Sequence, residues 1–266
     1  MSSKQPIALI TGFKAGTWMM RKVLYQMTGM EFYEPDIIPG EKKYFNPEQL
    51  KFKDNHFYSW HIVPTPEVVD KLKKNNAKTI FVLRNIYDVV VSIYYHFYND
   101  IDADIGRGNS KDKFLKQFSF EDGISLIITG FDEGNGIRWN GLNEIIVHYN
   151  EMLKASLACE SIIFNFDDLV ENKQESYRKI DKFLNLEIDD EKIDEIVQKT
   201  SFSSMKVEAE NSKVGKSHFR LGKAKENRKS LSEVHEVMIR QQIKLFAPDF
   251  YTNLSNNGLD YIVEEF

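Results

Sequence analysis

The sequence has few of the features that mark a secreted or membrane protein. Cys159 is the only cysteine among 266 residues, so an internal disulfide is excluded and a reducing compartment is favoured. No apolar run approaches the roughly 20 residues that a membrane helix needs. The apolar stretch near the N-terminus is too short for a signal peptide. These absences predict a cytoplasmic protein that does not act at a membrane.

The charge balance argues against another class. The formal net charge is −5, which disfavours general binding of nucleic acid. Hydrophobic residues make up 42% of the chain and charged residues 28%, as in ordinary globular proteins. The chain also has no internal repeat and no low-complexity linker. We therefore expect a single domain over residues 1–266.

The stretch from Pro6 to Leu24 organises the rest of the chain. It begins with the apolar run Ile7–Ile10, which is typical of a strand buried on both faces. The loop Gly12–Thr17 follows, and a helical pattern begins after it. Such a loop presents backbone N–H groups to a phosphate, and here Lys14 would add a charge while Thr17 would cap the helix.

Two other interpretations of this loop must be weighed. A nucleoside-triphosphate P-loop has its lysine directly after the second glycine, whereas Lys14 precedes Gly16, so that signature is absent. Taken alone, the loop is also compatible with an ordinary turn that carries one solvated lysine. Motifs elsewhere in the sequence are needed to distinguish between these interpretations.

Strand and helix patterns alternate along the chain. Residues 57–62, 79–83 and 161–166 resemble strands, and helical patterns cover 66–72, 86–98, 142–157, 176–184, 191–197 and 231–246. Residues 99–137 read as loops around helical pieces, and 33–46 and 209–227 as loops. This alternation predicts an α/β fold with a central parallel sheet flanked by helices on both faces.

Candidate binding residues follow three of the predicted strands. Lys14 comes after the first strand, His61 after the second and Arg84 after the strand 79–83. Because ligands of open α/β sheets bind beyond the carboxyl ends of the strands, these side chains should meet there.

Several short motifs occur in order along the chain. They are Gly12–Met19, Ser59–Pro64, Arg84–Phe97, Phe166–Asp168, Thr200–Phe202 and Arg220–Gly222. In order and spacing they resemble the motifs of sulfotransferases that use 3′-phosphoadenosine-5′-phosphosulfate (PAPS), especially the cytosolic type. The resemblance spans about Pro6 to Phe246, and it implies an α/β domain with a P-loop-like loop for the phosphosulfate.

The resemblance also implies a role for the matched residues. His61 would be the catalytic base, because the ordinary histidine pKa of about 6.5 suits proton transfer near neutral pH. Lys14 would stabilise the leaving oxygen. The implied PAPS-binding residues are Lys14, Ala15, Gly16, Thr17, Trp18, Arg84, Ser92, Phe166, Thr200, Phe202, Phe219, Arg220 and Gly222.

These binding residues divide among the parts of PAPS. Lys14, Gly16 and Thr17 suit the 5′-phosphosulfate, whereas Arg84, Ser92 and Arg220 suit the 3′-phosphate. The adenine would lie against Thr200, Phe202 and Trp18. We expect the lysine-rich residues 213–229, which include Arg220, to cover the nucleotide.

The chain departs from the family pattern at several of these positions. Ala15 lacks a hydroxyl, Trp18 replaces a threonine that binds phosphate, and Met19 replaces a tryptophan expected against adenine. Leu221 removes a cation and Phe166 removes a tyrosine hydroxyl. These changes would weaken nucleotide binding but leave the proposed chemical residues in place.

Two further histidines and one acidic pair have simpler interpretations. His148 and His235 are expected on helix surfaces. Asp167 and Asp168 are adjacent, but no ligand cluster at a suitable spacing accompanies them, so we expect no metal.

The sequence thus predicts an enzyme that moves the sulfuryl group of PAPS to a hydroxyl or amine of a small molecule, releasing 3′,5′-adenosine bisphosphate (PAP). Two alternatives stay open: a non-catalytic PAP-binding protein of the same fold, and a nucleotide kinase or P-loop NTPase.

The acceptor is less well defined. Acidic residues gather in the loops expected to roof the pocket, namely Asp100, Asp102, Asp104, Asp132 and Glu133. Solvated loop carboxylates are the simpler interpretation. The alternative hypothesis is that they attract a cationic natural product as acceptor.

The sequence predicts a monomer or a weak homodimer. The cytosolic family often carries the dimer motif Lys-x-x-x-Thr-Val-x-x-x-Glu, of which the stretch Lys229–Met238 keeps only Lys229 and Val234. Light scattering should therefore detect no tight dimer. A tight dimer that a Val234→Glu substitution dissociates would contradict this prediction.

Overall fold

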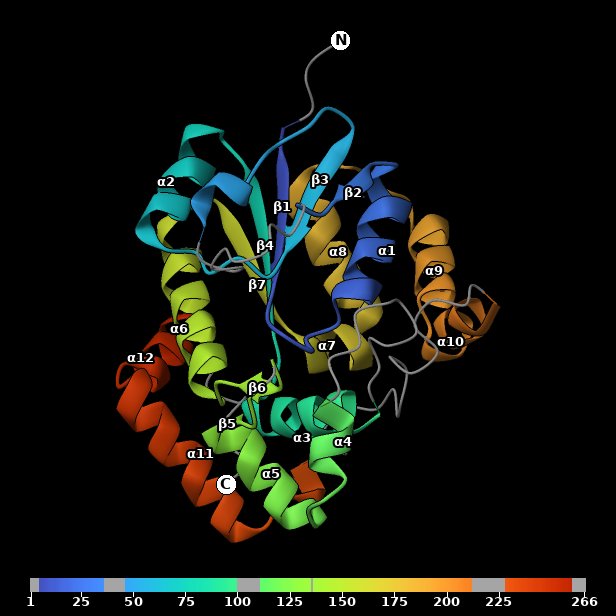
Figure 1. Ribbon diagram of the computed structural model, residues 1–266. Coiled ribbons are helices and arrows are strands. Elements are labelled where there is room, and N and C mark those ends of the chain that lie inside the picture. Colours follow the sequence, from blue (N-terminus) through green and yellow to red (C-terminus); the bar gives the residue numbers. More distant parts are fainter. Residues whose placement is uncertain (1–4, 36–45, 100–110, 135, 212–227, 260–266) are drawn as a thin grey trace. The chain divides into compact units, whose positions relative to one another are not determined.

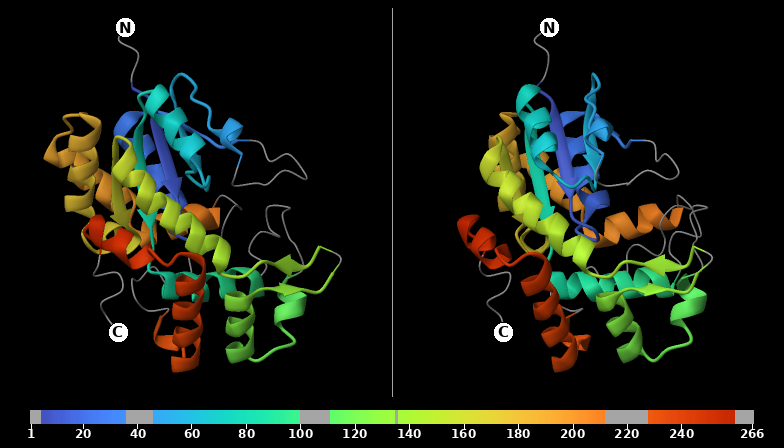
Figure 2. Two further views of the ribbon diagram at one scale, coloured as in Figure 1. Left: turned by 90° about the vertical axis from the view of Figure 1, so that its left-hand side faces the viewer. Right: turned by 60° about the vertical axis from the view of Figure 1, so that its left-hand side comes forward.

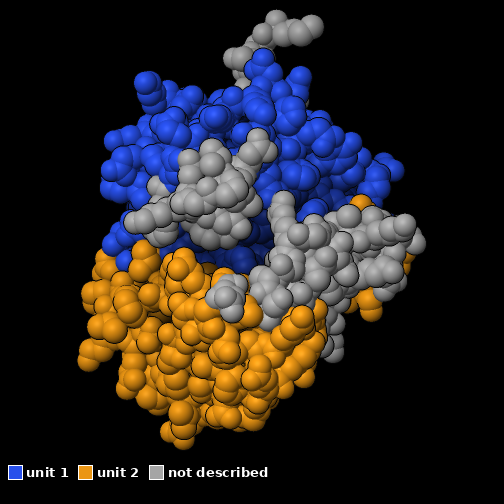
Figure 3. Space-filling model, in the orientation of Figure 1, with its two compact units in different colours: residues 1–84, 148–200, 251–266 blue, residues 85–147, 201–250 orange. Residues whose placement is uncertain are grey.

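A computed structural model of the protein describes residues 5–35, 46–99, 111–134, 136–211 and 228–259. The chain divides into two compact units, each assembled from separate segments (Figure 3). The first unit contains residues 1–84, 148–200 and 251–266, and the second contains 85–147 and 201–250.

The first unit is built on a five-stranded sheet (Figure 1). In spatial order its strands are β2 (Glu31–Tyr33), β3 (His56–Trp60), β1 (Ile7–Thr11), β4 (Lys78–Leu83) and β7 (Ser161–Asn165). Every neighbouring pair is parallel, which confirms the predicted parallel sheet. The unpredicted strand β2 is a short, mostly exposed edge strand, so it lacks the apolar run that marks the others.

Helices cover both faces of this sheet. The helices that belong wholly or mainly to the first unit are α1 (Thr17–Thr28), α2 (Pro66–Lys74), α6 (Asn143–Ala158), α7 (Phe166–Glu171), α8 (Lys173–Leu184), α9 (Asp190–Lys199) and α12 (Phe250–Asn256), with a 3-10 turn η1 at Pro47–Gln49. Helices α2 and α6 lie on one face, and α1 and α8 on the other (Figures 1 and 2). Because both faces are covered, all residues of β1 and β4 are buried, including polar ones such as Thr11 and Thr79.

The second unit is mainly helical. Its elements are α3 (Ile86–Tyr98), α4 (Lys111–Leu115), α5 (Phe120–Thr129), α10 (Phe202–Asn211), the 3-10 turn η4 (Arg228–Ser230), α11 (Glu233–Phe246) and an antiparallel ribbon of β5 (Phe131–Asp132) and β6 (Arg138–Trp139). His235 of α11 is buried, and its Nε2 lies 3.0 Å from the carbonyl oxygen of Glu121. The prediction of a surface position for His235 was therefore wrong.

Some predicted boundaries also need correction. The strand predicted at 161–166 ends at Asn165, because the Asn165 side chain accepts a hydrogen bond from the Asp167 N–H and so begins α7. Helix α10 extends to Asn211, within the region expected to be a loop from residue 209. In the described ranges, no helix has the length and apolarity needed to cross a bilayer.

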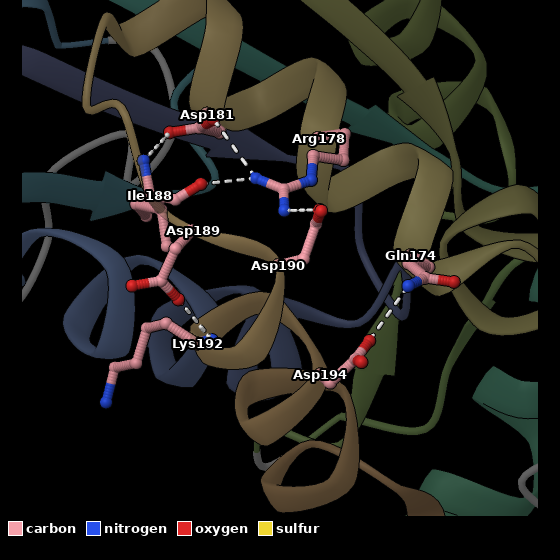
Figure 4. A network of polar contacts seen from close by, with 8 residues as sticks. All are labelled: Gln174, Arg178, Asp181, Ile188, Asp189, Asp190, Lys192 and Asp194. Carbon is pink, nitrogen blue, oxygen red and sulfur yellow. Dashed lines mark hydrogen bonds and ion pairs between the residues drawn. The ribbon is translucent and has the colours of Figure 1, made fainter.

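Arg178 holds the connection between α8 and α9 in place (Figure 4). Its guanidinium donates to the carbonyl oxygen of Ile188 and pairs with Asp190 and Asp181. Asp181 also accepts a hydrogen bond from the Ile188 N–H at 3.0 Å. The network fixes the chain just before α9, the helix whose C-terminal end carries Thr200.

Replacement of Arg178 by Met should destabilise the protein by about 1–2 kcal/mol, because the Ile188 carbonyl and the Asp181 carboxylate lose a donor. Urea unfolding would measure this loss. Lys179→Met is the matched control, since its ion pair with Glu175 is exposed and should contribute little to stability. Equal losses in the two variants would show that the Arg178 network does not hold the connection.

Candidate functional site

The candidate site lies within the first unit, where neighbouring strands end side by side. Ile10 of β1 is opposite Trp60 of β3, Thr11 is opposite Val82 of β4, and Leu83 is opposite Asn165 of β7. The residues that follow these strands therefore emerge at one edge of the sheet: the loop 12–17, His61, Arg84 and Phe166. This is the edge at which open α/β sheets bind ligands.

The loop 12–17 is closely packed against two aromatic rings. A Cβ atom on Gly12 would lie 2.1 Å from the Tyr149 ring, and one on Gly16 would lie 2.4 Å from the Phe166 ring. Gly16 also has a φ of +81°, which favours glycine. Only glycine fits these positions, so the loop backbone is held close to the end of the sheet.

Lys14 has an unusual backbone conformation for a residue with a side chain. Its φ is +61°, in the left-handed region that costs a non-glycine residue free energy. Its carbonyl oxygen accepts a hydrogen bond from Arg84 Nη1 at 3.3 Å. Lys14 and Arg84, two of the cationic residues predicted for the site, are thus linked through the loop backbone.

Helix α1 begins at this loop. Its N-cap is Gly16, without a side-chain cap, so the prediction that Thr17 caps the helix was wrong. Thr17 is the first helical residue, and its hydroxyl lies 2.7 Å from the hydroxyl of Thr11. The first N–H groups of a helix have no intrahelical acceptor, and they form the positive end of its dipole. The loop can therefore bind an anion.

Arg84 is positioned by the end of β7. The guanidinium lies over the Phe166 ring, 4.8 Å from its centroid, and only 8% of the residue is exposed. Its Nε is buried and has no hydrogen-bond partner among the described residues. A buried donor of this kind is costly unless a ligand accepts from it. Phe166 thus supports Arg84 by stacking, although it lacks the tyrosine hydroxyl of the family pattern.

His61 is held by hydrogen bonds between its Nδ1 and Thr11. Its Nδ1 lies 2.8 Å from the Thr11 carbonyl oxygen and 3.2 Å from the Thr11 hydroxyl. A carbonyl oxygen only accepts, so Nδ1 must carry the proton. Nε2 is therefore the nitrogen at which the ring gains and loses its second proton.

His148 of α6 is buried beside the residue that follows His61, so the prediction that it lies on the helix surface was wrong. Only 4% of the residue is exposed, and its Nε2 lies 3.0 Å from the carbonyl oxygen of Ile62, the residue after His61. Burial, aided by the nearby His61, lowers the pKa of His148 to about 3. His148 is thus neutral near pH 7 and supports the chain next to His61.

Thr200 ends α9 with its side chain directed into the protein. Its hydroxyl lies 2.7 Å from the Tyr177 hydroxyl and donates to the Ile196 carbonyl at 2.7 Å. Lys173 donates to the Thr200 carbonyl at 2.6 Å, and burial lowers the pKa of this lysine. These contacts fix the position of Thr200, but they occupy the groups that adenine was expected to use.

The other predicted residues are less constrained or belong elsewhere. Trp18 is 43% exposed on α1, with the Arg21 guanidinium 5.5 Å from its ring centroid, and Ala15 is buried in the loop. Ser92 lies on α3 and Phe202 begins α10, both in the second unit. Phe219, Arg220 and Gly222 lie outside the described residues.

Sequence reasoning missed Thr11, Tyr149 and the role of His148. Thr11 ends a strand, and the other two lie in a helix more than 130 positions later, so no local motif marks them. Among the described residues, no group of three or more His, Cys, Asp or Glu side chains could hold a metal ion.

The fold and this edge define an α/β protein whose cationic loop suits a phosphate or sulfate group. A sequence-family model, that of the sulfotransferase domain, matches residues 19–254. The chain therefore belongs to the sulfotransferase family. Mouse sulfotransferase 6B1 is 26% identical over 221 residues, which cover 77% of this chain and 66% of the relative. Rabbit amine sulfotransferase is 30% identical over 136 residues, or 51% of this chain and 38% of the relative. The chain thus spans less than two thirds of these relatives.

Solved sulfotransferase-type structures share the fold. The crystal structure of mouse sulfotransferase SULT7A1 complexed with PAP has a TM-score of 0.66 at 16% identity, covering 98% of this chain and 88% of the other. Retinol dehydratase in complex with androsterone and PAP has a TM-score of 0.63 at 16% identity, covering 96% and 82%. They confirm the predicted architecture of a parallel sheet between helices.

The buried His148 makes a prediction about pH. Unfolded His148 takes up a proton below about pH 6.5, whereas the folded residue does so only near pH 3, so this group removes stability as the pH falls between those values. Between pH 8 and pH 5 the wild type should lose about 2 kcal/mol more than His148→Gln in urea unfolding. The partly exposed His56 provides the control, and His56→Gln should behave as the wild type. Parallel pH curves for wild type and His148→Gln would refute the assignment.

Proposed function

We propose that this protein transfers the sulfuryl group of PAPS to a hydroxyl or amine of a small molecule and releases PAP. One observation carries the proposal: Lys14, His61 and Arg84 follow three adjacent parallel strands and lie at the same edge as the N-terminus of α1. This arrangement combines cations, helix N–H groups and a histidine base. Membership of the sulfotransferase family and the PAP complexes of SULT7A1 and retinol dehydratase support it.

The residues at this edge fit the anionic ends of PAPS. The backbone close to Gly16, the Thr17 hydroxyl and Lys14 would bind the 5′-phosphosulfate, and the buried Nε of Arg84 would donate to the 3′-phosphate. Further contacts that the family motifs suggest are Ala15, Trp18, Ser92, Phe166, Thr200, Phe202, Phe219, Arg220 and Gly222. We propose that Thr200 acts through its fixed backbone position, because its hydroxyl already bonds to Tyr177.

The chemistry requires a base and stabilisation of the leaving group. The acceptor oxygen or nitrogen attacks the sulfur of PAPS, and the bond from sulfur to the bridging phosphate oxygen breaks. His61 Nε2 takes the proton of the acceptor, while Nδ1–H stays bonded to Thr11. The Lys14 ammonium offsets the charge that develops on the bridging oxygen of PAP. By analogy with phosphoryl transfer, positioning and electrostatics supply most of the catalysis.

The acceptor is proposed to be a small molecule with a hydroxyl or amine. Androsterone and retinol are bound by retinol dehydratase, and one relative is named an amine sulfotransferase. Asp132 gives little support to the hypothesis of a cationic acceptor. Its carboxylate accepts a hydrogen bond from the Gly134 N–H at 2.9 Å, and the residue is opposite Arg138 in the β5–β6 ribbon. A panel of phenols, steroids, amines and guanidinium alcohols with labelled PAPS would identify the class.

We propose that residues 1–266 act as one cytoplasmic sulfotransferase domain, because the family match runs through segments of both units. Two alternatives remain to be tested, a non-catalytic PAP-binding protein and a nucleotide kinase. PAP should raise the melting temperature and Mg-ATP should not, since a ligand stabilises the state that it binds. PAP binding without transfer to any acceptor of the panel would favour the non-catalytic protein.

His61→Ala and Lys14→Ala should each lower the rate of sulfuryl transfer by about a hundredfold or more, because they remove the base and the charge at the leaving oxygen. Transfer from labelled PAPS to the best acceptor of the panel is the measurement. Controls are His56→Ala and Lys74→Ala, which change the same residue types elsewhere in the first unit. EDTA should leave the rate unchanged. Near wild-type turnover in either site variant would reject its proposed role.

A further inference from the structure

Thr11 connects the proposed base to the proposed phosphosulfate loop. Its hydroxyl lies 2.7 Å from the Thr17 hydroxyl and 3.2 Å from His61 Nδ1, while its carbonyl accepts from the same Nδ1 at 2.8 Å. Thr11 itself is fully buried at the end of β1. The proposed base and the first residue of α1 are therefore joined through the Thr11 side chain.

The direction of these hydrogen bonds follows from elementary chemistry. His61 Nδ1 carries a proton, because the Thr11 carbonyl can only accept. Toward the nearby hydroxyl, Nδ1 can therefore act only as a donor, so Thr11 Oγ accepts from His61. Between Thr11 and Thr17, either hydroxyl can donate to the other when no ligand is bound. When Thr11 is the donor, the proton of the Thr17 hydroxyl is directed away from Thr11, and this hydroxyl has no other hydrogen bond among the described residues.

A phosphate or sulfate group bound at the Thr17 hydroxyl would fix which of the two threonines donates to the other. Its oxygens only accept, so a Thr17 hydroxyl that binds it must donate to it and can accept only from Thr11. The reverse order, in which Thr17 donates to Thr11, is then excluded. With a bound anion, Thr11 Oγ thus donates to Thr17 and accepts only from His61 Nδ1–H in this pair of contacts, which holds the ring with Nε2 as its basic atom.

We propose that Thr11 is a positioning residue that couples the phosphosulfate loop to His61, so that binding of the cosubstrate holds the base in its working orientation. This inference rests on the proposed function, because it takes the ligand at Thr17 to be the 5′-phosphate end of PAPS. Thr11 touches neither the cosubstrate nor the acceptor in this scheme. It acts through Thr17 on one side and through His61 on the other.

Thr11→Val tests the coupling with little change of shape, since valine is isosteric with threonine and keeps the backbone carbonyl. Thr11→Ser is the matched control because it retains the hydroxyl. We expect Thr11→Val to lower kcat for the best acceptor of the panel about tenfold, with the KM for PAPS within about threefold of the wild type, because the base loses orientation while the loop keeps its ligand contacts. Thr11→Ser should stay within about threefold of the wild type in both values.

A spectroscopic readout separates coupling from a merely structural role. In protein with ¹⁵N-labelled histidine, a His61→Gln variant identifies the His61 signals. Addition of PAP should slow the exchange of the His61 Nδ1–H with water severalfold in the wild type and in Thr11→Ser, but not in Thr11→Val. If PAP binds the wild type and this exchange does not change, the coupling is refuted whether or not Thr11→Val folds.

Calorimetric titration with PAP distinguishes the two levels of failure. If the wild type binds no PAP, the proposed function fails and the coupling fails with it. If the wild type binds PAP and transfers the sulfuryl group, but Thr11→Val equals Thr11→Ser in kcat and in Nδ1–H exchange, only the coupling is overturned. A loss of PAP affinity without a loss of kcat in Thr11→Val would likewise overturn it, because Thr11 would then serve the loop alone.

Discussion

The parallel pairing of β3, β1 and β4 is the constraint on which the rest of the site depends. Because the strands run in the same direction and in near register, the residues after Trp60, Thr11 and Leu83 emerge together. The hydrogen bonds of the sheet therefore fix the positions of these residues relative to one another. The Gly12 N–H continues this pattern, since it donates to the Val82 carbonyl at 2.8 Å beyond the last strand residue. The loop 12–17 therefore begins as a continuation of β1.

Aromatic packing then fixes what the strands bring together. Tyr149 closes against Gly12, and its hydroxyl donates to the Phe13 carbonyl at 3.4 Å. Phe166 fills the space beside Gly16 and supports the Arg84 guanidinium. Burial raises the pKa of Tyr149 despite the positive charge of Arg84, so its hydroxyl stays protonated and able to donate. The loop is thus enclosed by rings from two elements that follow it far along the chain.

The extent to which the sequence predicts this site depends on how local each signal is. Lys14, His61 and Arg84 come within three residues of the ends of buried strands, and both the strands and the edge at which they end could be inferred from the sequence pattern. The positions of Thr11, Tyr149 and His148 depend on contacts between segments that are distant in sequence. His148 occurs in a helical pattern that gives no sign that its face is covered, so it was placed on the surface. The burial of the Thr200 hydroxyl was likewise invisible, because it depends on Tyr177 of another helix.

The left-handed backbone of Lys14 has a consequence for how this protein can change. Asparagine or glycine tolerates that conformation better than lysine, so either residue would relieve the local strain. Each would also remove the ammonium group that the proposed reaction needs. With Lys14 in its proposed role, selection for stability and selection for activity oppose one another at position 14, and variants chosen only for resistance to heat should accumulate Asn or Gly there while they lose turnover.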